Sequence, residues 1–449
     1  MVFTRDLRVT DNPALAAAAA GADQVIPVFV LDEAILDRHG ANRTRLAFML
    51  GSLRDLDASL RKRGGQLVIR RGAWTRAVAD LAAEAGARSI HLADDVSGYA
   101  QRRVTGLREL AGSARIDVQV HPGVMVAGPE PICPGGGGPY QVFTPYYRKW
   151  GGSPRRGLAL TPGKIRLPEM VEPGHIPELA ELTGGPARSG AGLPAVAGEG
   201  GESAGQARLK AWSARHLASY DRDRDDLAAD ATSRLSAYLH FGCLSPLAVA
   251  TALSARAGGA PFVRQLAWRD FFAQLLAARP DAAHRDYRDH GDQWHEDKDS
   301  LEAWKAGQTG FPVVDAAMRQ LADEGFMHNR ARMIVASFLT KDLYIDWRLG
   351  ADHFLALLAD ADLANNQLNW QWVAGTGTDR QPHRMFNPTV QGKRFDPTGE
   401  YVARYVPELA GLPPAQIHDP PREVRRARGY PAPIVDHQAA AAARRARSG

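Results

Sequence analysis

The segment NNQLNWQWVAGTGTD, residues 365–379, gathers side chains that could bind a flat ligand or carry an electron. Asn365 and Asn366 are adjacent, and Trp370 and Trp372 are separated by one residue. Carboxamides and indole N–H groups need hydrogen-bond partners once they are buried, so they are costly as core filler. An indole also has a flat face for stacking on a base or a cofactor ring, and it is readily oxidised by one electron. The segment therefore predicts a binding site for an aromatic ligand.

Tryptophan is concentrated in the same part of the chain. Six of the nine tryptophans lie between residues 268 and 372. A place in the core is the commoner interpretation for any single one, but two stand in polar surroundings, GDQWHED and KDLYIDWRLG. The group favours stacking platforms or a chain of redox-active rings. The six are Trp268, Trp294, Trp304, Trp347, Trp370 and Trp372.

Charged and hydroxyl side chains flank the aromatic ones. Asp360 and Asp362 could cap a helix, their commonest use, or accept hydrogen bonds from ribose hydroxyls or an imide N–H. Arg330 and Arg332 could form ion pairs or bind phosphate. The segment TSRLS, residues 232–236, could begin a helix whose N-terminus binds phosphate, with simple N-capping as an equal alternative.

Motifs for other chemistries are missing from the sequence. It contains no HExxH, GxGxxG or GxxxxGK[ST] pattern, and GESAG at 201–205 matches GxSxG only within the glycine-rich stretch predicted to be a loop. Its two cysteines, Cys133 and Cys243, are too few for a disulfide framework or a cysteine zinc site. We therefore expect no metal and no standard dinucleotide, P-loop or serine-hydrolase site.

Length and composition indicate a globular protein of two or three domains. The chain has 449 residues, of which 45% are hydrophobic and 23% charged. No apolar run reaches membrane-spanning length, and MVFTRDLRVTDNP lacks the basic-then-apolar order of a signal peptide. We therefore expect a cytoplasmic protein with no membrane partner.

The net charge of +5 is unevenly distributed. Residues 422–449 carry seven arginines against Glu423 and Asp436, so the rest of the chain sums to zero. Because there is no bulk charge to attract a polyanion, any nucleic-acid site must be a local basic face.

The first 125 residues alternate between strand-like and helix-like patterns. Such alternation with apolar strands favours a doubly wound parallel sheet of the Rossmann-like α/β class. Asn12 and Pro13 are typical of an N-cap followed by proline at the first helical position. The expected strands are the stub MVF and residues 24–32, 66–72, 89–95 and 116–122, and the expected helices include 44–62 and 74–85.

The remaining chain divides by composition. Residues 126–205 are expected to be a linker, because proline and glycine are frequent there, as in 134–139 and 184–205. Helical periodicity then dominates, for example in 261–278 and 315–339. We predict an α/β domain over 1–125, the linker over 126–205, an all-α domain over 206–436 and a disordered tail over 437–449.

Taken together, the motifs resemble the photolyase/cryptochrome family of light-dependent flavoproteins. The resemblance rests on TSRLS, LAWRDFF, TGFPVVDAAMRQL, MHNRARM, KDLYIDW, DADLANNQLNWQW and FNPTVQGKRFDP, and it extends to FTRDLRVTDNPAL near the N-terminus. It is strongest toward bacterial photolyases that repair cyclobutane pyrimidine dimers. It implies a monomer that binds UV-damaged DNA and holds FAD non-covalently in its helical domain.

The resemblance also assigns the flavin site. Asn366 would face flavin N5, and Asp360, paired with Arg332, would contact the ring edge and sugar together with Asp362. The FAD phosphates and ribityl chain would lie along Tyr220, Thr232, Ser233, Arg234, Leu235 and Ser236, with Arg269 as a further cofactor-binding residue.

Three tryptophans match the family's electron relay. Trp370 would touch the flavin, Trp347 would follow, and Trp294 would reach the surface. In this reading, light drives an electron from reduced flavin into the lesion, the cyclobutane ring splits and the electron returns.

The lesion would be flipped out of the duplex into a pocket over the flavin. Trp268 and Trp372 would form its apolar walls, with Asn329 and Met333 near the dimer. Gln265 stands where many dimer photolyases have a glutamate that hydrogen-bonds the thymine edge, and glutamine cannot share a proton there. The DNA phosphates would be held independently of sequence by Arg224, Arg330 and Arg384.

Related functions make different demands on the same positions. A cryptochrome-type photoreceptor often has Asp or Cys in place of Asn366 and a long C-terminal extension. A (6-4) photolyase is expected to carry a histidine pair near Asn329 and Met333. A generic flavin oxidoreductase would need a nicotinamide site, which the sequence does not show. Dimer repair is therefore favoured, although Leu368 and Asn369 replace two glycines common in the family.

An antenna chromophore is expected in the α/β domain. Folate-binding relatives place a glutamate where this chain has Ser97, within DDVSGYAQRR. We therefore expect 8-hydroxy-5-deazaflavin, with methenyltetrahydrofolate or an empty site as the alternatives.

Overall fold

The computed structural model describes residues 1–38, 42–128, 132–184 and 193–448. It contains two compact units, each built from two stretches of chain. Unit 1 comprises Met1–Ala218 and Ser233–Pro280, and unit 2 comprises Ser219–Thr232 and Asp281–Gly449. Residues 185–192 of the predicted glycine-rich loop and 129–131 of the predicted linker lie outside the described residues.

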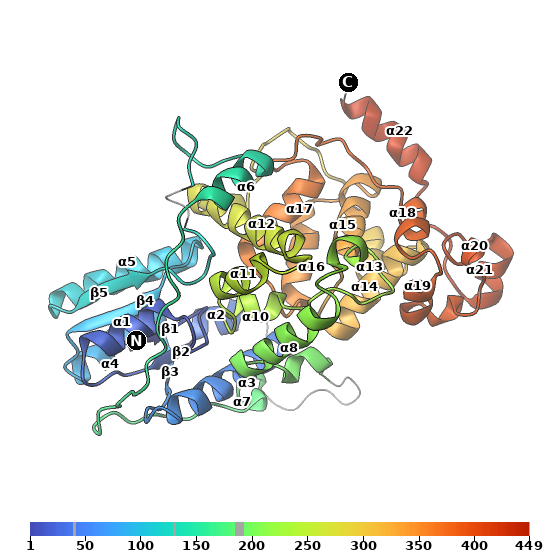
Figure 1. Cartoon of the computed structure of the whole chain (residues 1–449). Coiled ribbons are helices and arrows are strands. Elements are labelled where there is room, and N and C mark those ends of the chain that lie inside the picture. The colour runs from blue at the N-terminus through green and yellow to red at the C-terminus, as the bar shows by residue number, and fades with distance from the viewer. Residues whose placement is uncertain (39–41, 129–131, 185–192, 449) are drawn as a thin grey trace. The chain divides into compact units, whose positions relative to one another are not determined.

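Unit 1 contains a five-stranded parallel sheet in the order β3-β2-β1-β4-β5, which confirms the predicted doubly wound class (Figure 1). The stub MVF forms the central strand, where Val2 pairs with Val28 on one side and Leu92 on the other. Two residues suffice because both neighbours supply partners. The strands are β1 (Val2–Phe3), β2 (Val28–Asp32), β3 (Val68–Gly72), β4 (Ser89–Ala93) and β5 (Asp117–His121).

Helices separate these strands along the chain, as the sequence predicts. Asn12 caps the first one by accepting a hydrogen bond from the Leu15 amide at 3.0 Å, with Pro13 at the first helical position. Trp74, Val78, Leu81 and Leu107 of the next helices pack in the core with the sheet valines. The helices are α1 (Pro13–Gly21), α2 (Glu33–Arg38), α3 (Arg43–Arg61), α4 (Trp74–Glu84) and α5 (Gly98–Ser113).

The compact units differ from the predicted division. The predicted linker contains helical elements, and the helices that follow it up to residue 280, except the short one at Tyr220–Asp223, belong to unit 1 rather than to a separate all-α domain. Buried contacts explain this: Trp150, inside the predicted linker, donates to the buried Asp270 at 3.0 Å. These elements are α6 (Phe143–Gly152), α7 (Leu179–Thr183), η1 (Ala195–Gly198), α8 (Glu202–Arg215), α10 (Ser236–His240), α11 (Pro246–Ser254) and α12 (Gly259–Ala278).

Unit 2 is helical in its described part. The periodic stretch 315–339 is interrupted at Gly325, which ends a helix with φ 60°. The next helix begins at Asn329 and passes into a five-residue π-helix, η3. Its elements up to η3 are α9 (Tyr220–Asp223), α13 (Lys298–Lys305), α14 (Pro312–Glu324), α15 (Asn329–Ser337) and η3 (Phe338–Asp342).

The remaining helices of unit 2 include α17, which contains most of the segment NNQLNWQWVAGTGTD, residues 365–379. α16 packs against α17, and α14 packs against α18 and α19. None of the described helices has the length and apolarity needed to cross a membrane. They are α16 (Trp347–Leu357), α17 (Leu363–Ala374), α18 (Pro388–Phe395), α19 (Glu400–Tyr405), η4 (Pro407–Leu409), α20 (Pro414–Ile417), α21 (Arg422–Arg428) and α22 (His437–Ser448).

The tail over 437–449 differs from the prediction of disorder. Residues His437–Ser448 form α22, which packs against η3. His437 pairs with Asp342 at 2.5 Å, and Arg444 pairs with Asp292 at 3.5 Å. The alanine- and arginine-rich composition suggested a frayed end because the sequence does not reveal these acidic partners.

Candidate active site

Three of the predicted site residues form one stripe on α17. Asp362, Asn366 and Trp370 follow one another at intervals of four, so they share a helix face. Asp362 is the N-cap and accepts a hydrogen bond from the Asn365 amide at 3.0 Å. The Asn365 side chain donates to the same carboxylate at 2.9 Å, which gives this residue a capping role.

The amide of Asn366 is oriented by its neighbours. Its Nδ2 donates to the carbonyl of Ala351 in α16 at 3.1 Å and to the side chain of Gln367 at 2.9 Å. With the nitrogen committed, Oδ1 is the atom that can accept a hydrogen bond from a ligand. The packing of α16 against α17 therefore makes Asn366 a hydrogen-bond acceptor toward a ligand.

Arg332 and Asp360 form the ion pair that the resemblance implies. Two guanidinium nitrogens contact the two carboxylate oxygens at 2.8 and 3.3 Å, and Arg332 also donates to the Met327 carbonyl at 2.9 Å. Asp360 is buried, so the bidentate pair neutralises its charge where water cannot.

Trp370 is buried among other rings. Its edge meets Phe354 at a centroid distance of 5.0 Å and Trp304 at 6.1 Å. Gly350 of α16 makes this possible, because a Cβ there would lie 2.3 Å from the indole. The glycine therefore lets the two helices approach closely at the stripe.

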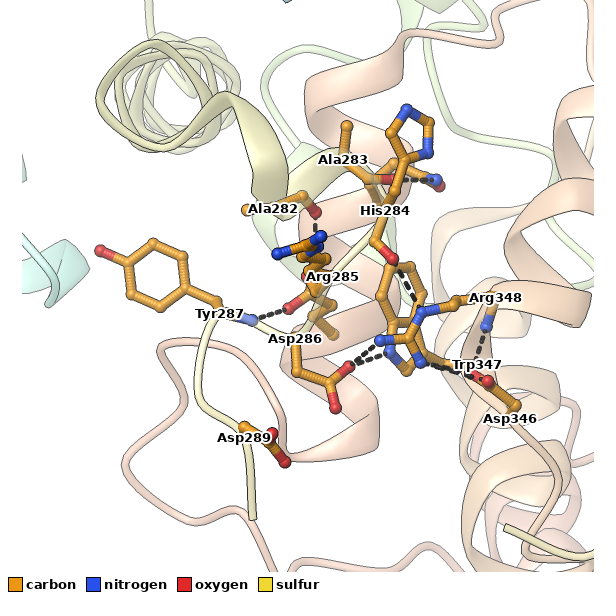
Figure 2. A network of polar contacts seen from close by, with 12 residues as sticks. Ala282, Ala283, His284, Arg285, Asp286, Tyr287, Asp289, Asp346, Trp347 and Arg348 are labelled. Atoms are coloured by element: carbon orange, nitrogen blue, oxygen red, sulfur yellow. Dashed lines mark hydrogen bonds and ion pairs between the residues drawn. The ribbon is translucent and has the colours of Figure 1, made fainter. Parts of the chain in front are cut away.

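Trp347, at the start of α16, is fully buried and donates its indole N–H to Asp286 at 2.8 Å (Figure 2). Asp286 also pairs with Arg348 at 2.7 Å, so the acceptor of the indole N–H is part of an ion pair. An anionic acceptor on the indole N–H stabilises positive charge on the indole. Sequence reasoning missed Asp286, because nothing in DYRDHG marks it.

A second stripe of α17 holds the segment that carries Asp286. Gln367 donates to the Ala283 carbonyl at 2.8 Å, and Gln371 donates to the Ala282 carbonyl at 2.7 Å. Gln371 also accepts a hydrogen bond from the Tyr287 amide at 2.6 Å. Sequence reasoning assigned no role to these glutamines, although their spacing of four is a signal for a shared face.

Trp294 is the most accessible of the three predicted relay residues. Trp370 and Trp347 are buried, whereas Trp294 is only partly buried and packs at the edge of the unit 2 core. Its ring contacts Tyr344 at a centroid distance of 4.9 Å. Exposure therefore separates Trp294 from the two buried indoles, and the relay stays a prediction.

The predicted DNA-binding residues of unit 2 are partly engaged within the protein. Arg330 pairs with Asp225 at 2.8 Å, lies over Phe395 at 4.4 Å and donates to the Met333 sulfur at 3.9 Å. Asn329 is exposed at the start of α15. The others are Trp372, partly buried; Arg224, 3.5 Å from Asp221; and Arg384, exposed and 5.0 Å from the Phe386 ring.

The predicted site residues of unit 1 lie on α12 and in the segment before α10. Trp268 stacks on Phe143 at 3.6 Å with an interplanar angle of 6°, so one face of its indole is covered. Gln265 donates to the Pro261 carbonyl at 3.4 Å. Arg269 donates to the carbonyls of Val124 and Leu239.

The comparisons with known proteins cover both ends of the chain. Residues 1–163 match the family model described as DNA photolyase, and residues 262–448 match the FAD binding domain of DNA photolyase. A deoxyribodipyrimidine photo-lyase from Streptomyces griseus is 48% identical over 97% of this chain and 96% of its own length. The chain belongs to the DNA photolyase family.

Solved structures of family members agree with this assignment. The class III photolyase from Agrobacterium tumefaciens has a TM-score of 0.89 at 35% identity, covering 100% of this chain and 96% of that one. The archaeal photolyase from Sulfolobus tokodaii, solved with two FAD molecules, has a TM-score of 0.86 at 29% identity, covering 100% and 98%. The DNA photolyase fold therefore extends over the whole chain.

Several polar groups fit the FAD that the matched domain binds. Within the described residues, the buried Thr232 hydroxyl and His328 Nε2 have no hydrogen-bond partner. Burial raises the pKa of Tyr220 to about 12 and lowers the pKa of His328 to about 4, so both are neutral near pH 7. Neutral donors and acceptors of this kind suit a ligand rich in hydroxyl and phosphate oxygens.

The segment TSRLS has a different geometry from the one predicted. It does not open a long helix, because α10 has only five residues and begins at Ser236. Arg234 instead has φ 53°, in the left-handed region, and the Ser233 carbonyl accepts a hydrogen bond from Arg208 at 3.1 Å. The residues at Thr232–Ser236 therefore form a bent loop, and their contact with the cofactor phosphates stays a prediction.

Proposed function

We propose that this chain uses light to split cyclobutane pyrimidine dimers in DNA, with FAD as its cofactor. The observation that carries the proposal is the stripe Asp362–Asn366–Trp370, which places a capping carboxylate, an oriented amide and an oxidisable indole on one face of α17. The family membership of the full chain supports the same activity.

FAD, when bound in its reduced form, supplies the light-driven electron that splits the cyclobutane ring. The chain's own residues position and protect it. Asn366 presents Oδ1 to a ligand N–H, because its Nδ2 is held by Ala351. Arg332 and Asp360 present a paired, locally neutral group at the edge of the site, and Asp362 remains tied to the helix N-terminus. The protein thus contributes orientation and electrostatics.

The relay tryptophans serve to restore the reduced cofactor. Electrons would pass inward from Trp294, which is partly buried, through Trp347 to Trp370, which are both buried. Asp286 stabilises positive charge on Trp347 through the indole N–H. This function needs no contact with the lesion.

DNA recognition in this proposal depends on backbone contacts and on extrusion of the lesion. Arg224, Arg330 and Arg384 would bind phosphates, and Trp268 and Trp372 would line the lesion pocket with Gln265 and Met333. Phe143 already covers one face of Trp268, so a pyrimidine would have to contact another part of this indole.

The main rival is a cryptochrome-type photoreceptor. Asn366 favours repair, because a neutral amide with a free acceptor oxygen differs from the acidic or thiol side chain common in photoreceptors. The (6-4) photolyase alternative is not favoured, since Asn329 and Met333 stand where a histidine pair is expected.

For the antenna we propose 8-hydroxy-5-deazaflavin over methenyltetrahydrofolate. Ser97 stands at the position of the folate-binding glutamate, and its hydroxyl is used to cap α5 through the Ala100 amide at 3.2 Å. We further propose a monomer acting on DNA in the cytoplasm. Extraction of the chromophores from purified protein and analytical ultracentrifugation test these two points.

The decisive experiment is a repair assay on two lesions. Protein with fully reduced FAD is illuminated with near-UV light in the presence of oligonucleotides that carry either a thymine dimer or a (6-4) photoproduct. Restoration of the dimer alone is expected. Absence of dimer repair by the reduced holoprotein would refute the proposal, and repair of the (6-4) lesion alone would favour the alternative substrate.

A further inference from the structure

Lys341 is a buried lysine on the π-helix η3. Among the residues that the structure describes, it forms no ion pair with a carboxylate. Burial lowers the pKa of this lysine from the ordinary 10.5 to about 7, so keeping it charged costs stability. An apolar side chain would fill the same space without that cost, so the charge is expected to have a role.

The ammonium contacts two backbone carbonyls. Its Nζ donates to the Ala374 carbonyl at 2.5 Å and to the Pro382 carbonyl at 2.7 Å. Ala374 is the last residue of α17, where the helix dipole favours a cation. One charged group therefore holds both ends of the loop formed by residues 375–382.

This loop is folded tightly over the end of α17. Gly375 ends the helix with φ 91°, and a Cβ there would lie 2.5 Å from the Pro382 carbonyl oxygen and 3.0 Å from Lys341 Nζ. The Gly377 amide donates to the Gln371 carbonyl at 3.0 Å. The loop thus turns back on the helix that it leaves, and the lysine closes it.

The loop connects two residues that recognise DNA in the proposed function. Trp372, the lesion-pocket wall, lies two residues before the first anchor, Ala374. Arg384, the phosphate ligand, lies two residues after the second anchor, Pro382. The Arg384 amide also donates to the Gln381 carbonyl at 3.0 Å, which ties its backbone to the loop.

We propose that the Lys341 ammonium is a positioning group for DNA binding, which closes the loop 375–382 and so fixes Arg384 relative to Trp372. The inference rests on the proposed function, which supplies the DNA and the roles of these two side chains. A charged lysine makes stronger hydrogen bonds to carbonyls than a neutral one, so the protonated form closes the loop more firmly.

The proposal predicts that DNA binding depends on pH. Because the folded pKa of Lys341 is about 7, the lysine is charged below this pH and neutral above it. Affinity for DNA that contains a dimer should therefore be highest below pH 7 and should fall as the pH rises through this value.

Four charged or titratable side chains surround the ammonium. Asp292 and Asp379 raise its pKa, and Arg444 of α22 lowers it. Asp379→Asn should therefore move the midpoint of the affinity profile to lower pH, and Arg444→Gln should move it to higher pH. The fourth is His383, with His290 beside it; burial lowers the pKa of His383 below the ordinary 6.5, so it is already neutral where the lysine titrates.

The test is fluorescence anisotropy of an oligonucleotide with one thymine dimer, titrated in the dark with full-length holoprotein at pH values on both sides of 7. Lys341→Met keeps the apolar stem and removes the charge. On the acidic side it should bind the dimer about tenfold more weakly than the parent, and on the alkaline side the difference should narrow to about twofold. Lys305→Met, which removes a more exposed lysine paired with Glu302 in the same unit, should match the parent.

Two measurements separate positioning from a folding defect. FAD content and the repair rate at saturating DNA should stay at the parent level in Lys341→Met. Without DNA, hydrogen exchange of the amides at residues 375–381 should be faster in this variant than in the parent at the same acidic pH. If the variant loses FAD, the parent profile and the two midpoint shifts still decide: a parent affinity that does not fall above pH 7, or midpoints unmoved in both Asp379→Asn and Arg444→Gln, would overturn the proposal.

Binding and repair distinguish this proposal from the function on which it rests. Lysine-dependent binding of the dimer without repair by the reduced holoprotein would refute the proposed function and leave the Lys341 assignment standing. Repair with equal affinities for parent and Lys341→Met would overturn the Lys341 assignment alone. A parent that binds no DNA would refute both.

Discussion

Each unit has a buried tryptophan whose indole N–H meets an aspartate, but the two pairs differ in electrostatics. In unit 1, Trp150 donates to Asp270 at 3.0 Å. Arg269 pairs with this carboxylate only at 4.0 Å, and burial outweighs that cation and raises the pKa of Asp270 to about 6. In unit 2, Trp347 donates at 2.8 Å to Asp286, which is paired with Arg348 at 2.7 Å.

The difference indicates what each pair does. Asp270 gathers three donors, the Val126 and Ala127 amides and the Trp150 indole, and so joins the predicted linker to α12 within unit 1. Asp286 is paired with Arg348 in unit 2 and accepts from the Trp347 indole, where a carboxylate can stabilise an oxidised ring. A buried Trp–Asp pair therefore serves folding in unit 1, and in the proposed function the other pair serves redox chemistry in unit 2.

Replacing the indole of Trp347, the proposed relay residue of unit 2, should have the largest effect on photoreduction. Trp347→Phe keeps an aromatic side chain but removes the oxidisable indole, so photoreduction of bound flavin should slow by an order of magnitude or more. Trp150→Phe should leave this rate unchanged. Both rates can be followed by the visible absorbance of flavin under continuous illumination, and equal slowing in the two variants would remove the distinction between the pairs.

Replacing the two aspartates should affect stability in the opposite order, with the larger loss for Asp270 in unit 1. Asp270→Ala leaves three buried donors unsatisfied and should lower the free energy of unfolding by about 4 kcal/mol. Asp286→Ala acts on a more accessible pair and should cost about 1 kcal/mol. Urea unfolding measures both values. A loss in Asp286→Ala as large as that in Asp270→Ala would contradict the assignment.

The Asp270 pair should also respond to pH. Its folded pKa of about 6 lies above the ordinary value of 3.8, so the folded state binds the extra proton between these values. Its contribution to stability is complete below about pH 4 and is lost as the pH rises to about 6, by up to about 1.4 kcal/mol per pH unit. Asp270→Asn should lack this dependence. Parallel pH profiles of unfolding free energy for parent and variant would count against a protonated Asp270.

The smallest effect is expected at Trp304. This indole is fully buried and contacts Trp370, but its N–H donates to the Val335 carbonyl at 3.2 Å and not to a carboxylate. Trp304→Phe should lower stability by about 1 kcal/mol and leave photoreduction unchanged. A marked slowing would show that ring contact alone, without a charged acceptor, is enough to join the relay.

Much of the fold could be predicted from the sequence because its signals are local. The Asn12–Pro13 cap, the alternating strands and the Asp362 cap each depend on neighbours within a few residues. The unit division could not be predicted in this way. Glycine and proline marked 126–205 as a linker, but the buried contact of Trp150 with Asp270 joins residues 120 positions apart.

The candidate site shows the same difference between local signals and contacts of distant residues. Motifs alone pointed to Asn366, Trp370, Trp347 and Trp294, and the spacing of four put Asp362, Asn366 and Trp370 on one face. The sequence predicted no role for Asp286, Gln371 or Tyr344, because their contacts involve residues from other segments of the chain.

By itself the sequence determined the parallel sheet and the helical content, since periodicity and capping are written in short stretches, and its motifs predict which residues face the flavin and form the relay. Only the tertiary structure decided that the C-terminal segment is a docked helix, that Asp286 serves Trp347 and that Tyr344 contacts Trp294. Ion pairs, buried acceptors and ring contacts join residues far apart in the chain. These contacts form, and contribute to stability, only after the chain has folded.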